Sequence, residues 1–230
     1  MTTFPASSAS DELIERVAAN LAVVEGRIAS TGRARASVRI VAVTKTFPAS
    51  VVRAAAALGL DTFGENYVDE LEVKHRESAD LALRWHFLGS LQSNKIARIA
   101  TACDVVCGVT RVKELERLAA LRPGMALYVE VDHTGEAQRH GVAPEQVAPL
   151  VGRARELELD VRGLMTVAPL DALGARRAFS ATVALADDLG LRERSMGMSD
   201  DLEAALECGT TEVRLGRALF GPREAPRGPE

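Results

Sequence analysis

Residues 38–44 read V-R-I-V-A-V-T, a nearly continuous run of β-branched and apolar side chains. Such a run is typical of a strand that is covered on both faces, as the strands of parallel sheets are. A helical pattern precedes it. Apolar residues recur at spacings of three and four from Asp11 to about Thr31, with Ser10 at the N-cap position and Gly32 at the C-cap position. We therefore expect a helix followed by a buried parallel strand.

The same alternation of strand and helix continues along the chain. Strands are predicted at 38–44, 61–66, 84–89, 103–109, 125–132, 159–166, 193–197 and 211–216, and helices at 49–59, 67–79, 92–100, 111–121, 144–157, 172–189 and 200–208. With a short helix after the eighth strand, these make eight units, which predict an α/β fold, a single (β/α)8 TIM barrel with an extra N-terminal helix. An open doubly wound sheet is the alternative, since a sequence pattern cannot show that a barrel closes.

The composition and charge of the chain exclude several classes of protein. Its 230 residues carry 28 basic and 32 acidic side chains, so the net charge of −4 provides no global positive field for nucleic acid or anionic membranes. No secretory signal, no apolar stretch of membrane length and no metal-binding spacing of Cys or His is present. We expect a cytoplasmic protein with one barrel at 10–222, flexible ends at 1–9 and 223–230, and no second domain.

Lysine is rare in this chain, and one lysine stands out. Only four of the 28 basic residues are lysines: Lys45, Lys74, Lys95 and Lys113. Lys45 ends the first predicted strand, where a barrel places its chemistry. Desolvation there lowers the pKa of an amine and makes it nucleophilic toward an aldehyde or ketone. A solvated lysine at a strand end is the alternative interpretation.

Two segments near the C-terminus predict an anion site. In S-M-G-M-S-D-D (195–201), Ser199 precedes a predicted helix, and in T-E-V-R-L-G-R-A-L-F-G (211–221), Gly216 lets the backbone approach a ligand. The loops after strands seven and eight are the recurrent phosphate site of such barrels. A plain N-cap role for Ser199 is the alternative.

An amine that reacts with aldehydes and a phosphate site in one cavity describe pyridoxal 5′-phosphate (PLP). Arg214, at the end of the eighth strand, could face the pyridine nitrogen; its permanent charge would keep that nitrogen unprotonated. Asn66 and His86 could hydrogen-bond the ring oxygen; the alternatives are an N-cap for Asn66 and an inward barrel position for His86. Met165 could pack on the ring or only in the barrel core. Lys95 is expected to be an exposed helix lysine, or else to meet an anion or a partner.

Six segments, in order, resemble one family: V-A-V-T-K, F-G-E-N-Y-V-D-E, W-H-F-L-G-S-L-Q-S-N-K, G-L-M-T, S-M-G-M-S-D-D and E-V-R-L-G-R-A-L-F-G. The resemblance, from about residue 10 to residue 222, is to the pyridoxal phosphate homeostasis proteins, which are similar to the barrel half of alanine racemase, the type III PLP fold. It implies PLP held as a Schiff base on Lys45 and phosphate contacts at Ser199 and around Gly216 and Arg217. It also implies that Arg214 lies at the pyridine nitrogen.

The resemblance implies storage, buffering or delivery of PLP without established catalysis, with apo-enzymes as acceptors. An amino-acid racemase is the alternative, but it needs a second domain that supplies a tyrosine, whereas this chain offers only Tyr67 and Tyr128. A cofactor-free aldolase that uses Lys45 is a third possibility. We expect a monomer. Arg139 stands where family members often carry a lysine, so a role for a second amine there is in doubt.

Overall fold

The computed structural model describes residues 9–136 and 138–222, which form a closed barrel of eight parallel strands paired in sequence order. The strands are β1 (Arg39–Val43), β2 (Thr62–Glu65), β3 (Arg84–Phe87), β4 (Val105–Val109), β5 (Ala126–Val131), β6 (Asp160–Thr166), β7 (Glu193–Ser195) and β8 (Glu212–Leu215). β8 pairs with β1 from Arg39 opposite Glu212 to Ala42 opposite Leu215, which closes the ring. The (β/α)8 prediction is therefore confirmed, and the open-sheet alternative is wrong.

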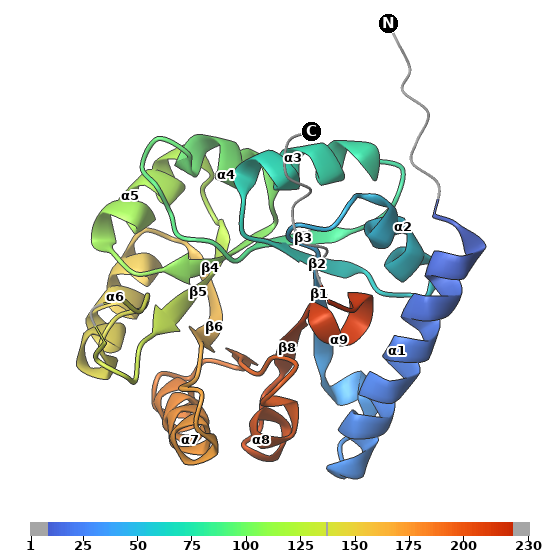
Figure 1. Cartoon of the computed structure of the whole chain (residues 1–230). Coiled ribbons are helices and arrows are strands. Elements are labelled where there is room, and N and C mark those ends of the chain that lie inside the picture. Colours follow the sequence, from blue (N-terminus) through green and yellow to red (C-terminus); the bar gives the residue numbers. More distant parts are fainter. Residues whose placement is uncertain (1–8, 137, 223–230) are drawn as a thin grey trace, which may run out of the picture.

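The helices surround the strands (Figure 1). They are α1 (Asp11–Ser30), α2 (Ser50–Ala57), α3 (Val68–Glu77), α4 (Ile96–Ala102), α5 (Val112–Leu121), α6 (Pro144–Glu156), α7 (Ala172–Asp188), α8 (Leu202–Glu207) and α9 (Arg217–Phe220). A 3₁₀ turn at Arg35–Ser37, which the sequence did not indicate, leads into β1. The residues at 1–8 and 223–230, where flexible ends were predicted, lie outside the described part.

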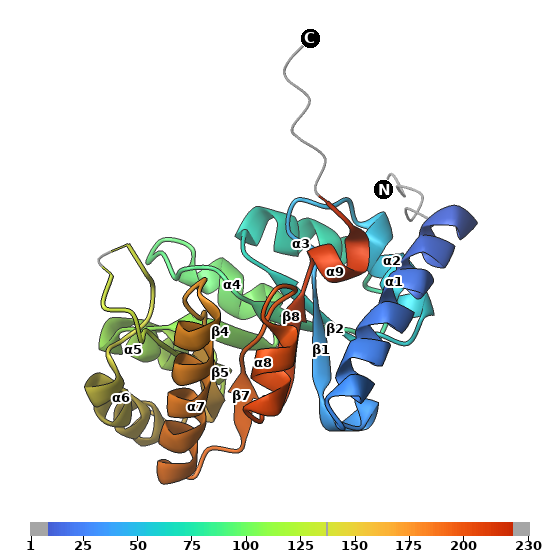
Figure 2. The ribbon, with the colours of Figure 1, turned by 60° about the horizontal axis from the view of Figure 1, so that its bottom comes forward.

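The extra N-terminal helix packs on α2, from the first unit of the barrel, and on α8 and α9, from the last two. Ser10 caps α1 by accepting a hydrogen bond from the Leu13 amide, as predicted. Farther along α1, the Asn20 side chain donates to the carbonyl oxygen of Leu219 in α9 at 2.9 Å. Figure 2 shows α1 lying along the outside of the barrel beside β1 and α9. The helix thus bridges the two ends of the barrel sequence.

The amino-terminal half of the barrel interior is polar. Glu212 is fully buried there, and the hydroxyl of Ser195 donates to its Oε1 at 2.7 Å. Burial alone would raise the pKa of Glu212, but His86, Ser195 and Arg39 outweigh it and hold that pKa at about 2. Tyr128 also donates to Glu212, at 3.3 Å. This network occupies the amino-terminal half of the barrel interior.

Within the described residues, no helix is both long enough and apolar enough to cross a lipid bilayer.

Candidate functional site

A cavity of about 440 Å³ opens at the carboxyl ends of the strands. Seven of the eight residues predicted for the site line it: Lys45, Asn66, Met165, Ser199, Arg214, Gly216 and Arg217. They come from segments as distant in sequence as β1 and α9, and barrel closure brings them to one place. Their roles toward a ligand stay predictions, but their meeting in one cavity is a property of the fold.

The backbone on both sides of Lys45 is held by one pair of side chains from α3. Lys74 Nζ donates to the carbonyl oxygen of Thr44 at 2.6 Å, and Glu70 Oε2 accepts the Thr46 amide at 2.8 Å. Lys74 and Glu70 also pair with each other at 2.8 Å. Thr46 has a φ of 66°, a left-handed conformation that costs a non-glycine residue about 1–3 kcal/mol. The α3 pair therefore fixes a strained turn around Lys45.

Lys74 is itself buried in an ion pair. Its side chain is 4% exposed, and it donates to Glu65 Oε1 at 2.6 Å, while that carboxyl is fully buried at the end of β2. Burial raises the pKa of Glu65, although Lys74 and Thr44 act against the shift. A buried pair of this kind adds little net stability but is costly to break. Sequence analysis missed this network; the rarity of lysine in the chain was the available signal.

Arg214 spans three strands beneath the cavity. From β8, its guanidinium donates to the carbonyl oxygen of Ser195 in β7 at 2.5 Å and to that of Thr166 in β6 at 2.8 Å. The residue is only 6% exposed, and none of the ion pairs among the described residues includes it. Its acceptors are neutral, so its positive charge remains uncompensated by a contacting carboxylate at the cavity floor.

The loops after β7 and β8 are joined at the cavity by Ser199. Its hydroxyl accepts a hydrogen bond from the Ala218 amide in α9 at 3.1 Å. Helix α8 begins three residues later with Asp201 at its N-cap position, so the plain N-cap role for Ser199 is wrong. Arg217 forms an ion pair with Asp200 at the rim. Hydroxyl, amide and guanidinium groups thus gather at one side of the cavity.

Gly216 lies directly against the first strand. A Cβ atom at this position would lie 3.2 Å from the carbonyl oxygen of Val43, two residues before Lys45. The close approach brings the α9 turn next to the end of β1. The loops after β7 and β8 and the lysine therefore line the same cavity, because a glycine at position 216 lets two backbones meet.

His86 is the one predicted residue that does not line this cavity. It is 2% exposed inside the barrel, with its Nδ1 3.7 Å from Glu212 Oε1 and 3.7 Å from the Cys107 sulfur. It lines a different cavity, together with Arg39 and Tyr128. The inward barrel position, which was the alternative interpretation, is what the structure shows for His86.

Three other residues singled out from the sequence are also placed. Asn66 does not cap α3, because Tyr67 occupies the N-cap position. Lys95 is half-buried at the N-cap position of α4 and is not on the cavity wall. Arg139 donates to the Ala168 carbonyl oxygen at 3.4 Å and pairs with Glu136.

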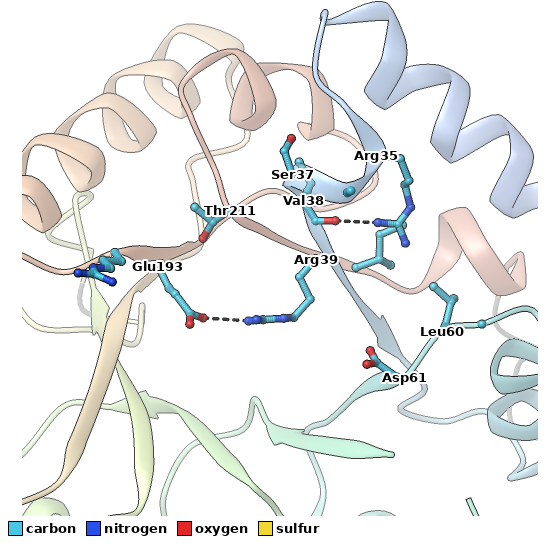
Figure 3. A pocket seen from close by; sticks show the side chains of 12 residues that line it. Arg35, Ser37, Val38, Arg39, Leu60, Asp61, Glu193 and Thr211 are labelled. Carbon is cyan, nitrogen blue, oxygen red and sulfur yellow. Dashed lines mark hydrogen bonds and ion pairs between the residues drawn. The ribbon is translucent and has the colours of Figure 1, made fainter. Parts of the chain in front are cut away.

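A third cavity lies at the amino-terminal end of β1 (Figure 3). There Arg39 pairs with Glu193 at 2.9 Å, and Arg35 donates to the Val38 carbonyl oxygen at 2.7 Å. These groups satisfy one another, and this end of a (β/α)8 barrel carries stability rather than chemistry. The cavity that contains Lys45 is therefore the candidate functional site.

The fold and the site together define a class of barrel, in which a lysine at the end of β1 shares one cavity with the loops after β7 and β8. Residues 14–224 match the family model described as alanine racemase, N-terminal domain. The alanine racemase of Corynebacterium glutamicum shares this fold, with a TM-score of 0.69 and 18% identity over 94% of this chain and 64% of that one.

Two relatives with higher sequence identity show to which family within this class the chain belongs. The pyridoxal phosphate homeostasis protein of Pseudomonas aeruginosa is 44% identical over 90% of this chain and 96% of that protein. The structure of PipY from Synechococcus elongatus with PLP bound has a TM-score of 0.79 and 33% identity, covering 89% of this chain and all of that one. The chain belongs to the family of the pyridoxal phosphate homeostasis proteins.

Proposed function

We propose that this chain binds pyridoxal 5′-phosphate and serves its homeostasis by storing, buffering or delivering it. The observation that carries the proposal is the meeting of Lys45, Ser199 and Arg214 in one cavity. The relatives support it, since one is named for PLP homeostasis and another is described with PLP bound.

The chemistry of the cavity fits this group. When bound, PLP supplies an aldehyde that condenses with a primary amine and releases water. Lys45 is the amine that lines the cavity, and the turn held by Lys74 and Glu70 positions it. The Ser199 hydroxyl, the backbone near Gly216 and the Arg217 guanidinium would hold the phosphate. These residues bind and orient the group at its two ends.

Arg214 suits a protein that holds the cofactor without transforming it. A guanidinium stays charged throughout the physiological pH range, so it cannot transfer a proton to a pyridine nitrogen. An unprotonated ring withdraws electrons weakly, and carbanions formed next to it are poorly stabilised. We propose that Asn66 and Met165 contact the ring from the cavity wall.

No observation favours the racemase alternative. Both tyrosines of the chain are described, and neither lines the cavity. Tyr67 is 55% exposed at the start of α3, and Tyr128 is buried in the barrel interior against Glu193. Two-base racemisation requires acid–base groups on both faces of the substrate carbon.

We further propose that the protein acts as a cytoplasmic monomer and passes PLP to apo-enzymes. Light scattering at micromolar concentration should give the mass of one chain. Transfer should appear as recovered enzyme activity when the PLP-loaded protein is mixed in solution with a PLP-dependent apo-enzyme. The activity should recover faster than PLP dissociates spontaneously from the loaded protein.

The decisive experiment compares Lys45→Ala with Lys95→Ala. Protein incubated with PLP should show the absorption band of lysine-bound PLP, and borohydride should fix a phosphopyridoxyl group to Lys45 that peptide mass spectrometry locates. Lys45→Ala should lose both signals, whereas Lys95→Ala should keep them. Wild-type protein that stays colourless would refute the proposal. Turnover of D- and L-amino acids at about 1 s⁻¹ or faster would favour the racemase instead.

A further inference from the structure

Glu130 is a buried carboxyl group in the cavity wall that the proposed function does not use. It lies near the end of β5, is 8% exposed and lines the cavity together with Lys45 and Arg214. Its backbone is fixed, because its carbonyl oxygen accepts the Val142 amide at 2.8 Å. Its side chain makes no hydrogen bond or ion pair with any residue the structure describes. Neither of its oxygens is among the fully buried side-chain atoms that lack a partner, so the carboxyl keeps contact with the open space of the cavity.

The wall around Glu130 offers it no contacting partner. On β4, a Cβ atom at Gly108 would lie 3.4 Å from Glu130 Oε2, so the carboxyl packs over bare backbone. On β6, its register neighbour is the apolar Met165. The carboxyl therefore lies at the cavity wall with Oε2 facing the glycine backbone of β4 and no partner beside it among the described side chains.

The charged and titratable groups that face Glu130 are Arg214, Asp132, Glu114 and Cys107. Three of them are engaged elsewhere: Arg214 with carbonyl oxygens of β6 and β7, Asp132 with Thr134, and Glu114 with Arg111. Burial raises the pKa of Glu130 to about 7, with Arg214 acting against the shift and both carboxylates adding to it. The carboxyl consequently changes charge near neutral pH.

We propose that Glu130 is a ligand-facing residue that couples cofactor binding to proton uptake, so that the cavity holds the anionic cofactor more tightly as the pH falls. This inference rests on the proposed function, since it assumes that PLP occupies the cavity. Protonated Glu130 is neutral and can donate a hydrogen bond to the ligand. Ionised Glu130 adds a negative charge to the wall of a cavity that receives an anionic ligand, and the bound ligand displaces water from this carboxylate.

The direction of the effect follows from linkage. Because the ligand disfavours the ionised form, it raises the pKa of Glu130, and binding takes up as much as one proton from solvent. Above the pKa of the free protein, the affinity then falls by up to tenfold for each unit of pH. The proton exchanges with bulk solvent, so no further reactant is needed. A carrier built in this way retains cofactor at lower pH and releases it at higher pH.

The test is the affinity for pyridoxine 5′-phosphate, which lacks the aldehyde, from pH 6 to pH 9. This probe binds without condensing with Lys45, so the chemistry of the lysine does not enter. The phosphate of the probe titrates too, but it does so equally for every variant. The informative quantity is therefore the ratio of Kd between wild type and Glu130→Gln at each pH. The ratio should rise by about fivefold or more between pH 6.5 and pH 8.5, in line with the tenfold-per-unit limit.

The matched control is Glu145→Gln, which removes an exposed carboxyl on α6. The ratio of its Kd to that of wild type should stay constant across the pH range. Calorimetry in buffers of different ionisation enthalpy should show proton uptake on binding for wild type and less uptake for Glu130→Gln. A flat ratio for Glu130→Gln, with all proteins binding the probe, would overturn the inference and leave the proposed function intact. If no variant binds the probe or PLP at any pH, the proposed function fails instead.

A second measurement covers the case in which Glu130→Gln does not fold. The carbon-13 shift of the Glu130 carboxyl in the wild-type protein reports its ionisation directly. It should titrate near neutral pH without ligand and move to higher pH when pyridoxine 5′-phosphate is added. Titration at the ordinary acidic pH of a glutamate, or a midpoint that ligand leaves unchanged, would contradict the proposal.

Discussion

The ammonium group of Lys74 lies 2.6 Å from the main-chain oxygen of Thr44, the residue directly before Lys45. Replacing Lys74 with Met should lower the free energy of unfolding by about 3–5 kcal/mol, because Glu65 is then left buried without its cation. Urea denaturation measures the loss. The double variant Lys74→Met with Glu65→Leu should recover part of it, since no unpaired charge remains. Lys113→Met, on the exposed face of α5, is the control, and an equal loss there would contradict the assignment.

Ser199 should distinguish ligands that carry a phosphate from those that do not. Ser199→Ala removes a hydroxyl that bridges the loop after β7 to Ala218. A hydrogen bond to a charged group is worth about 1.5–3 kcal/mol, so PLP should bind roughly tenfold or more weakly. Pyridoxal, without the phosphate, should bind as before. Ser180→Ala, on the exposed side of α7, should change neither affinity. Equal losses for both ligands would show that the hydroxyl acts only on the fold.

Glu212 should make the protein sensitive to acid. Its pKa in the folded protein is about 2, below the ordinary value of 4.5. The stability this provides is present above pH 4.5 and is lost as the pH falls toward 2, to the extent of about 3 kcal/mol. Urea midpoints measured between pH 6 and pH 2.5 should fall over that window. Glu212→Gln should be less stable than wild type near neutral pH, and its urea midpoint should fall less steeply below pH 4.5. If the midpoint of the variant falls as steeply as that of wild type, Glu212 is not the cause of the acid sensitivity.

Glu130 should have the opposite effect on stability. Its pKa in the folded protein is about 7, above the ordinary 4.5. The folded state then binds more protons than the unfolded state between these values, so stability falls as the pH rises from 4.5 through 7, by up to about 3 kcal/mol. Without ligand, Glu130→Gln should gain stability relative to wild type at pH 8 but not at pH 4.5. Parallel pH curves for the two proteins would disprove this.

Helix α1 should influence binding although it does not line the cavity. Arg27 donates to the Ser199 carbonyl oxygen at 3.0 Å and pairs with Glu203 at 2.6 Å. Arg27→Met should therefore loosen the loop after β7 and weaken PLP binding a few-fold. Arg16→Met, on the exposed face of the same helix, should bind as wild type does. Amide hydrogen exchange at residues 196–200 should increase in the first variant only.

The repeating strand–helix pattern predicted the barrel well because each unit obeys a local rule. The alternation of apolar runs and helical spacing needs only neighbouring residues, and the position of Lys45 at a strand end follows from it. His86 shows where that rule stops. The sequence places it on the third strand, but the depth of a side chain along the barrel axis depends on how all strands are staggered.

The residues that sequence analysis missed depend on contacts between distant segments. Lys74 belongs to a helix of mostly polar residues, and only the packing of α3 against β1 and β2 buries it. Glu130 interrupts the apolar run of β5 and was counted as part of the strand. Its importance comes from the absence of a neighbouring side chain at Gly108, which no pattern on β5 itself could indicate.

The hydrogen bond from Asn20 to Leu219 joins residues 199 positions apart, and that of Arg27 to Ser199 joins residues 172 apart. On the ribosome, roughly 10–30 s separate the synthesis of Arg27 from that of Ser199 at ordinary elongation rates. During this interval, α1 can pack on α2, but its contacts with α8 and α9 cannot form. The loops after β7 and β8 and the strand that completes the barrel are made last. The cavity that contains Lys45 is therefore complete only at the end of biosynthesis, because several of its lining residues come from the last strand and the loops around it.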